Sequence, residues 1–506
     1  MLSRRYKEGI NRQQPTMFPP TLDDYVTEVN PVRGIDTYVE SLDLQTYGFL
    51  NTELAGNCGA GQPAYPPQAL LKLYLYGYLN RVRSSRRLEK ETHRNIEVIW
   101  LVEGLRPSYK TIADFRKNNA KALRKVNKDF VILCKELGLF GGELVGIDGS
   151  FFKGNASKAS IQTKTQLEKE LKRIEEDIAA YQEQLKSQDE SDDAAGRGSL
   201  AEDGELEEKL EALKARQSAK ERVLESLEAS GETQHSRTDP DARLLSKNGQ
   251  RVAGYNVQQA VDAENKLIVD HEVTHDGNDS QQLAPMAKRA QETLEVEELT
   301  AVADSGYYQG EQIKECVDNG ITPYVAIPDK NKPIAAQGRY TRDQFAFEVE
   351  NNRYCCPAGQ HLEQQGNPYD KRGRKMIRYA GKISICGACP HKESCLTEKA
   401  KYRQIVRWEY EVTLDEHRQR MDEKGPEMMR KRSGLAEHPF GTLKSRMGWD
   451  HFLVRGFEKV RGEMSLMVLG YNFTRVLNLI GLQAFRECCA QNSRKWQENA
   501  EIVASN

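Results

Sequence analysis

The sequence predicts a mixed α/β domain that follows a helical domain and is interrupted by two inserts. Short apolar runs alternate with helix-like stretches between residues 141 and 327, and helical patterning returns over 404–482. An acidic stretch with heptad spacing occupies 163–232. A cysteine-rich stretch, in which the regular pattern breaks into loops, occupies 328–403. Because single cores seldom grow beyond about 250–300 residues, a chain of 506 residues should contain more than one domain.

The N-terminal part predicts a helical domain over 22–140, after a disordered segment over 1–21. The polar residues 483–506 predict a flexible tail after the last helix. Two basic stretches stand in it, NRVRSSRRLEKETHRN and RPSYKTIADFRKNNAKALRKVNKDF. Clustered Arg and Lys on short helices suit contact with DNA phosphates, and the alternative is an ordinary solvated helical face. Because two such helices occur in succession, we favour DNA binding. The candidate contacts are Arg81, Arg83, Arg86, Arg87, Arg116 and Lys117.

The charge is unevenly distributed along the chain. Residues 163–232 hold 11 Lys and Arg against 20 Asp and Glu, which leaves a net charge of +7 on the remainder of a chain whose total is −2. The body is therefore basic, as expected for a protein that binds nucleic acid.

The N-terminus has no secretory pattern. The late apolar run MSLMVLGYNFTRVLNLIGL contains Asn472, Arg475 and Asn478, so it predicts a buried helix rather than a membrane span.

The acidic stretch predicts an antiparallel helical hairpin. Its first half carries apolar residues spaced 4, 3, 4, 3 and 4 apart, which is a heptad seam: Leu167, Leu171, Ile174, Ile178, Tyr181 and Leu185. A seam of leucines follows in the second half: Leu206, Leu210, Leu213, Leu224 and Leu227. A spacer, a dimer contact and a plain solvated excursion all remain open as roles for this coiled-coil insert.

Two aspartates end apolar runs that predict strands. Asp148 follows Leu144–Ile147, and Asp304 follows Leu299–Ala303. If the strands are parallel neighbours, both carboxylates lie at one edge of the sheet, where ligands of α/β proteins bind. A turn or cap role is the usual alternative for such residues. Four further aspartates could also bind a metal, but a turn or cap role is again the usual alternative: Asp239, Asp241, Asp262 and Asp279.

A glutamate on a predicted helix completes the set. Glu437 lies at the margin of an apolar stripe formed by Ala436, Phe440, Leu443 and Met447, and Lys444 returns to its face seven positions later. A glutamate at such a margin is more commonly just exposed. Three carboxylates from separate elements can hold two Mg²⁺ ions about 3.5–4 Å apart, as phosphoryl transfer requires.

The cysteines point to a second metal. Five of the ten lie between residues 355 and 395, in a chain with no signal of secretion. Cys386 and Cys389 form a C-x2-C pair, which with Cys356 and Cys395 suits a tetrahedral structural Zn²⁺. Cys355 or His391 can replace one ligand. Ordinary reduced thiols are the alternative.

Several segments resemble the bacterial insertion-sequence transposases of the DDE class. GIDGSFFKGNAS, TAVADSGYY and LAEHPFGTLKSRMG resemble the three catalytic segments of that family. SRTDPDARLLSKNGQRVAGYNVQQAVD and FLVRGFEKVRGEMSLMVLGYNFTRVLNL resemble further stretches of its catalytic domain, which has an RNase H-like fold shared with retroviral integrases. The stretch from YPPQALLKLY to TIADFRK resembles its helical DNA-binding domain.

The resemblance implies a catalytic triad of Asp148, Asp304 and Glu437 that binds two Mg²⁺ or Mn²⁺ ions. It also implies that Lys444 contacts DNA. The family often has an arginine four positions before the glutamate. This sequence has Ser433 there and Arg432 one position earlier, so Arg432 is offered only as a DNA contact.

The implied substrates are double-stranded DNA: the terminal inverted repeats of the element and a target. A metal-activated water cleaves at the element end, and the freed 3′-OH attacks the target. We expect a homodimer at synapsis, no membrane association, and a cytoplasmic, nucleoid-associated location in bacteria. Alternatives on the same fold are a metal-dependent nuclease or resolvase that does not join ends. A domesticated zinc-containing DNA-binding protein is the non-enzymatic alternative.

Overall fold

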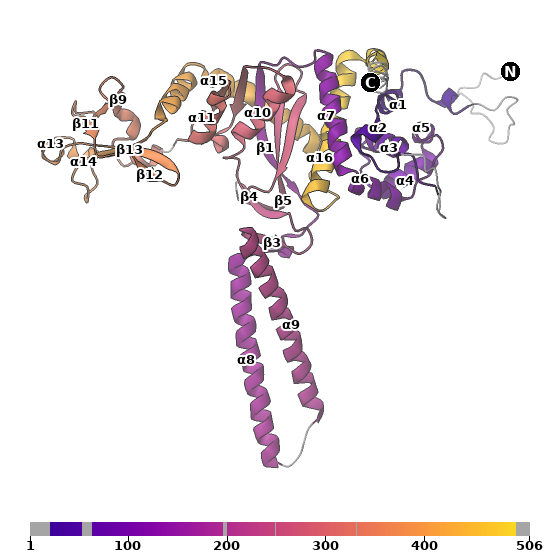
Figure 1. The fold of residues 1–506 in the computed structure, drawn as a ribbon, viewed down its shortest axis with the longest axis horizontal. Coiled ribbons are helices and arrows are strands. Elements are labelled where there is room, and N and C mark those ends of the chain that lie inside the picture. The colour runs from indigo at the N-terminus through magenta and orange to yellow at the C-terminus, as the bar shows by residue number, and fades with distance from the viewer. Residues whose placement is uncertain (1–20, 53–62, 196–199, 248, 330, 492–506) are drawn as a thin grey trace, which may run out of the picture.

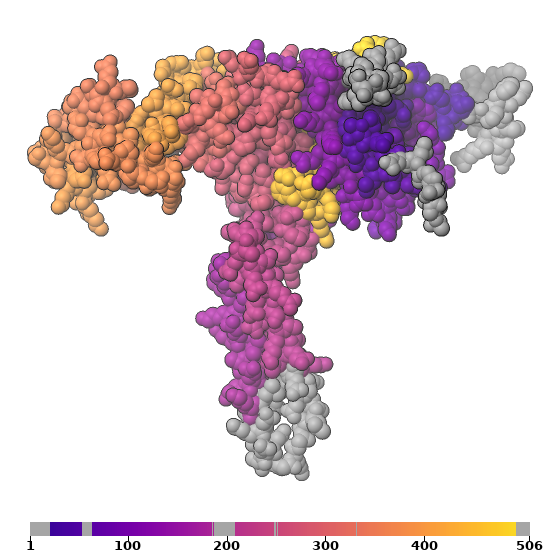
Figure 2. All heavy atoms as spheres, in the orientation of Figure 1, coloured from indigo at the N-terminus to yellow at the C-terminus, as the bar shows by residue number. Residues whose placement is uncertain are grey.

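The computed structural model describes residues 21–52, 63–195, 200–247, 249–329 and 331–491. A body with a long projecting arm is visible in Figures 1 and 2. The segments expected to be disordered at the two ends fall mostly outside the described residues. The described part of the expected tail is instead helical over 482–491, where Phe485 and Cys489 are buried. These two apolar side chains anchor the segment to the core of the N-terminal helices.

The N-terminal helices form a bundle that shares its core with the last long helix. Tyr38, Tyr74 and Phe130 are buried in one cluster with Phe473 of α16 (Phe457–Ile480). Because this core is continuous, the bundle is packed firmly onto the rest of the body. Its helices are α1 (Val32–Glu40), α2 (Leu44–Tyr47), α3 (Pro67–Leu79), α4 (Ser85–Arg94), α5 (Ile96–Leu101), α6 (Tyr109–Asn118) and α7 (Ala120–Glu136).

The central sheet is mixed, with the strand order β4-β5-β1-β7-β8, and β6 also pairs with β5. The strands β6, β5 and β1 are antiparallel neighbours, whereas β1, β7 and β8 run parallel. The expected mixed α/β class is thus confirmed. The two aspartate-bearing strands are parallel neighbours, which is the condition under which the sequence placed both carboxylates at one edge of the sheet. The strands are β1 (Leu144–Lys153), β4 (Arg243–Lys247), β5 (Gln250–Asp262), β6 (Ile268–Thr274), β7 (Leu299–Ala303) and β8 (Ile321–Val325).

Strand β1 is longer than the apolar run predicted. It continues past Asp148 to Lys153 because β5 stays paired with it, from Val145↔Asp262 to Lys153↔Gly254. Its parallel pairing with β7 stops at Gly146↔Val302. Asp148 therefore does not end the strand. Asp148 lies just beyond the point where β1 and β7 stop pairing. It is therefore next to Asp304, the residue that follows β7.

Helices cover both faces of the sheet. On one face, α10 (Leu283–Leu294) and α11 (Gly310–Asp318) bury Val145 and Ile147 of β1. On the other face, Leu435 of α15 (Glu411–Gly441) packs on Gly146 and Val302. The α-helix α15 passes into a π-helical turn at Thr442–Arg446. Among the described residues, no helix is long and apolar enough to cross a membrane.

The projecting arm is a helical hairpin of α8 (Lys164–Ala195) and α9 (Leu200–Ser230) (Figure 1). Its antiparallel pairing follows from the ion pairs Lys164–Glu228 and Lys220–Glu170. At its base, β2 (Ile161–Thr163) pairs with β3 (Gln234–Ser236). Of the predicted seam, Leu167, Leu171, Ile174 and Leu227 are buried, and the side chains of Leu185 and Leu206 lie outside the described residues. At 1.5 Å per residue, α8 extends about 48 Å from the body.

The cysteine-rich stretch, expected to consist of loops, forms a second sheet of short strands. The order is β12-β13-β11-β10-β9, and β14 also pairs with β13. Tyr354, Leu362 and Tyr379 form its small core. The elements are α12 (Lys332–Ala335), β9 (Ala346–Glu348), β10 (Arg353–Cys355), β11 (His361–Gln364), β12 (Tyr369–Lys371), β13 (Arg374–Ala380), α13 (Ile383–Gly387), α14 (Lys392–Cys395) and β14 (Gln404–Trp408).

Candidate active site

Asp148 and Asp304 meet at the guanidinium of Arg432, which extends from α15. Arg432 Nη2 lies 3.6 Å from Asp148 Oδ1 and 3.8 Å from Asp304 Oδ2. The three side chains are between 17% and 29% exposed, so the group opens to solvent without being at the surface. The arginine therefore sits where positive charge is needed to hold two carboxylates together. The sequence had suggested this arginine only as a DNA contact.

Local structure fixes the direction of each aspartate. Positions 146 and 148 lie on the same face of β1, and Leu435 of α15 packs on Gly146 there, so the side chain of Asp148 faces α15. Asp304 caps the short 3-10 turn Ser305–Tyr307, and its Oδ1 accepts a hydrogen bond from Gly306 N at 2.8 Å. This cap holds one oxygen and leaves Oδ2 turned toward Arg432.

Glu437 follows Arg432 by five positions on α15. It is exposed, and its Oε1 accepts a hydrogen bond from Ser433 Oγ at 3.1 Å. Ala436 and Phe440 beside it are buried, as the apolar stripe predicted. The structure thus puts Glu437 on the helix that already contacts the two aspartates. Its convergence with them stays a prediction.

Lys444 is held by the protein itself. Its Nζ donates to Ser150 Oγ and to the carbonyl of Phe151, both at 2.6 Å, and lies 4.4 Å from the ring centre of Phe152. The π-helical turn that contains Lys444 breaks the regular α-helical phase from which the sequence had placed it on the face of Glu437. In this structure Lys444 fastens α15 to β1, two residues beyond Asp148.

A buried tyrosine reports the electrostatics of the site. Burial raises the pKa of Tyr307 far above its usual value, and the negative charges of Asp279, Asp148 and Asp304 add to this effect, whereas Arg432 opposes it. Three carboxylates and one guanidinium therefore lie within electrostatic reach of one hydroxyl. This excess of negative charge, provided by hard oxygen atoms, fits a divalent cation such as Mg²⁺.

Two of the predicted DNA contacts are internal, which corrects the sequence-based expectation. Arg83 and Arg116 are only 8% and 4% exposed. Arg116 Nη1 lies 3.2 Å from Oε1 of Glu463, itself fully buried on α16, and Arg83 Nη1 lies 4.0 Å from the same oxygen. They join the N-terminal bundle to α16. The other predicted contacts remain at the surface: Arg81, Arg86, Arg87 and Lys117.

The four cysteines expected to bind zinc line one small cavity of about 30 Å³. Cys356 begins a tight turn: its N–H donates to Gln360 O at 2.8 Å, and Gln360 N donates to its Sγ at 3.3 Å. Burial and the neighbouring sulfurs of the other three raise the pKa of Cys395. The four are Cys356, Cys386, Cys389 and Cys395.

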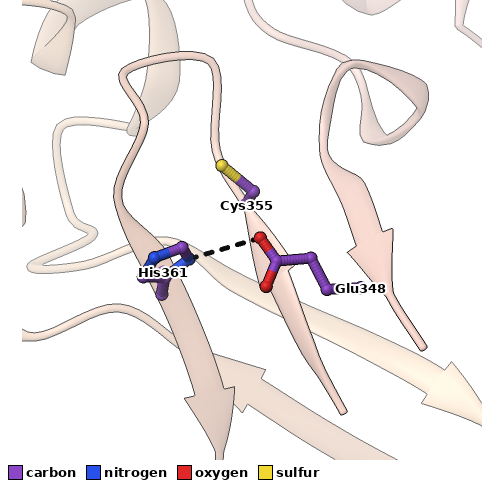
Figure 3. A group of neighbouring side chains, drawn as sticks. All are labelled: Glu348, Cys355 and His361. Carbon is purple, nitrogen blue, oxygen red and sulfur yellow. Dashed lines mark ion pairs between the residues drawn. The ribbon is translucent and has the colours of Figure 1, made fainter. Parts of the chain in front are cut away.

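A second group of metal-ligand types lies on the other face of this small sheet. Glu348, Cys355 and His361 come from three neighbouring strands, with their ligand atoms within 4.8 Å of one another (Figure 3). His361 Nδ1 is 3.8 Å from Glu348 Oε1, but Arg353 Nε lies closer, 2.7 Å from Glu348 Oε2. Because Arg353 already neutralises the Glu348 carboxylate, we interpret this group as an ion-pair cluster and not as a metal site.

Two family models match this chain. The model described as "Transposase domain (DUF772)" matches residues 20–118, and the model described as "Transposase DDE domain" matches residues 355–477, which include Arg432, Glu437 and Lys444. Both describe transposases. These two matches, over residues 20–118 and 355–477, support a DDE-class insertion-sequence transposase.

The other comparisons add little. No curated protein matches the chain. One solved structure that matches is a piggyBac transposase synaptic complex with hairpin DNA, at 8% identity and a TM-score of 0.33, over 93% of this chain and 82% of that chain. A similarity of this size is too weak to support a common fold.

Proposed function

We propose that this transposase cleaves DNA at the terminal inverted repeats of its element and joins the freed 3′ ends to target DNA, with Asp148, Asp304 and Glu437 as the metal-binding triad. The observation that supports this most is the meeting of Asp148 and Asp304 at Arg432, on the helix that carries Glu437. The mixed sheet, antiparallel on one side of β1 and parallel on the other, fits an RNase H-like catalytic domain.

The proposed cofactor is a pair of Mg²⁺ or Mn²⁺ ions held by these carboxylates. When bound, such ions activate a water or a 3′-OH and stabilise charge on the phosphate. The chain itself holds and orients the DNA. Lys444 fixes α15 against β1 through Ser150, so that the glutamate-bearing helix keeps a defined position beside Asp148. Positioning and charge stabilisation account for most catalysis of this reaction type.

The proposed DNA-binding surface includes the exposed cations of α4 and α6. Arg86 lies over the ring of Tyr109, 5.1 Å from its centre, and this stacking orders the guanidinium while leaving it exposed. Arg87 of α4 and Lys117 of α6 are exposed as well. A homodimer at synapsis, a dimer contact through the α8–α9 hairpin, and a structural Zn²⁺ on the four cysteines are further parts of the proposal.

The experiment is an assay with an end-labelled duplex that carries one terminal inverted repeat, incubated with the full chain and a target plasmid in Mg²⁺. Cleavage at the repeat boundary followed by covalent joining of the 3′ end to the plasmid supports the proposal. Cleavage without joining supports the nuclease or resolvase alternative. DNA binding without cleavage supports the domesticated DNA-binding protein. Asp148→Asn is the control that removes one proposed ligand and keeps the shape of the side chain.

A further inference from the structure

A fourth carboxylate, Asp279, lies beneath the candidate active site. It is 5% exposed and precedes α10, on the face of the sheet opposite to α15. Its Oδ1 accepts hydrogen bonds from Asn256 Nδ2 at 2.8 Å and from Gln258 Nε2 at 2.7 Å. These donors are uncharged amides on β5, the strand that pairs with β1 next to Asp148.

Two glycines let Asp279 approach the site. A β-carbon on Gly149, the residue after Asp148, would lie 2.6 Å from Asp279 Oδ1 and 2.4 Å from Gln258 Nε2, so no side chain fits there. A β-carbon on Gly306 would lie 2.9 Å from Asp304 Oδ1 and 3.8 Å from Asp279 Oδ2. The glycine that follows each of the two aspartates therefore carries no side chain on the side where Asp279 lies, and Oδ2 of Asp279 lies near Gly306.

A chain of buried polar groups holds this arrangement. Tyr307, in the turn that Asp304 caps, donates its hydroxyl hydrogen to Gln258 Oε1, and Gln258 donates in turn to Asp279. Tyr307, Gln258 and Asn256 are fully buried. The side-chain oxygen of Asn256 is buried without a hydrogen-bond partner. Burying an unsatisfied oxygen costs free energy, and a network with a purely structural role normally avoids it. The network thus fixes the orientation of the Asp279 carboxylate through two buried amide donors.

We propose that Asp279 is a positioning residue of the cation site, a buried anion that strengthens divalent-metal binding by Asp148 and Asp304 without being one of the triad. The inference rests on the proposed function. Like charges that converge without a cation raise the free energy of the folded metal-free protein, and a bound cation removes this cost. Asp279 acts through the orientation of the turn at Asp304 and through its charge. A carboxylate that only caps a loop has neither effect.

The experiment measures Mn²⁺ binding to the full-length protein without DNA, by titration calorimetry, together with thermal unfolding in the absence and presence of Mn²⁺. Asp279→Asn keeps the shape and the acceptor oxygen but removes the charge. Asp276→Asn removes the same charge from an exposed position on the same loop and is the matched control. We expect Asp279→Asn to weaken Mn²⁺ affinity about 10- to 100-fold, the range for residues that support metal ligands. The control should leave it unchanged.

The thermal data separate this role from a structural one. The proposal predicts that Asp279→Asn leaves the unfolding temperature of the metal-free protein unchanged or raised, and removes most of the increase that Mn²⁺ produces. A lowered metal-free unfolding temperature, or a failure to fold, overturns the proposal in favour of a structural cap. Tyr307→Phe, which frees Gln258 without removing a charge, should weaken Mn²⁺ binding less than Asp279→Asn does, and an unchanged affinity there also counts against the proposal.

Asp148→Asn in the same titration distinguishes two kinds of failure. If Asp148→Asn abolishes Mn²⁺ binding while Asp279→Asn binds normally, this inference is wrong and the proposed function stands. If neither variant alters binding, the cation site itself is misplaced and both proposals fail.

Discussion

Nη2 of Arg432 lies 3.6 Å from Oδ1 of Asp148, so a positively charged side chain of the protein stands beside the candidate metal ligand. The same nitrogen reaches Asp304. A divalent cation must therefore compete with this guanidinium for the same two carboxylates. Arg432 is thus an internal counter-ion for both Asp148 and Asp304.

This competition predicts that Arg432→Gln binds Mn²⁺ more tightly than the wild type. The gain should be about 0.5–1 kcal/mol, or roughly two- to fivefold in affinity, because the pair is partly screened by solvent. Calorimetric titration measures it. Arg430→Gln is the matched control, since Arg430 lies on the same helix and is exposed. Weaker binding in Arg432→Gln alone would mean that the arginine helps to assemble the site.

The buried pair of Glu463 with Arg116 predicts a large effect on stability. Glu463→Gln leaves two buried guanidinium groups, those of Arg116 and Arg83, facing a neutral amide. Breaking a buried pair by removing one partner costs about 3–5 kcal/mol. Urea unfolding measures the loss. Glu458→Gln, on the same helix with an ion pair to Arg461 at the surface, should cost less than about 1 kcal/mol. Equal effects of the two would argue against the buried link.

The buried His417 predicts a loss of stability in mild acid. Burial lowers the pKa of His417 to about 4, and its Nε2 accepts a hydrogen bond from Val325 N at 3.2 Å. Between the unfolded pKa near 6.5 and about 4, the unfolded chain binds a proton that the folded protein excludes. Stability from this group is therefore full above pH 6.5 and falls as the pH drops, by up to about 3 kcal/mol.

His417→Gln keeps an acceptor for Val325 but does not titrate. Its free energy of unfolding, measured in urea at pH 7 and pH 5, should fall less between the two pH values than that of the wild type. An identical fall in both proteins would show that other groups cause the acid sensitivity.

The cysteine cavity predicts one bound zinc ion that depends on Cys356 but not on its neighbour Cys355. Cys356 lines the cavity with the other three cysteines, whereas Cys355 stands with Glu348 and His361 on the other face. Elemental analysis of purified protein should find zinc in the wild type and in Cys355→Ser, and much less in Cys356→Ser and Cys389→Ser. Zinc lost from Cys355→Ser but kept in Cys356→Ser would assign the metal to the other group.

Much of the central fold could be predicted from local sequence pattern. The strand Leu299–Ala303 has the bounds that its apolar run gave, whereas β1 extends beyond its apolar run to Lys153. The strands of the cysteine-rich sheet escaped prediction because they are three to seven residues long and bury few of their side chains. Such segments lack the alternation that marks a half-buried strand.

The site was only partly visible for a different reason. Asp148 and Asp304 could be singled out because each follows an apolar run. Arg83 and Arg116 are internal because they pair with Glu463, which is more than 300 positions away in the sequence. The basic stretches alone do not reveal this partner, so both arginines were predicted to contact DNA. Asp279 was set aside as a cap, since only the folded register shows that it lies beneath Gly149.

The most direct test of the account is cleavage of the protein itself by a metal bound in the site. Fe²⁺ substituted for Mg²⁺, with ascorbate and peroxide, generates radicals that cut the backbone near the ion, and mass spectrometry locates the cuts. The account predicts cuts near Asp148, Asp304 and Glu437 in the wild type, suppressed by excess Mg²⁺ and absent from Asp148→Asn. Cuts near the two aspartates but none near Glu437, with DNA present or absent, would contradict the proposed triad.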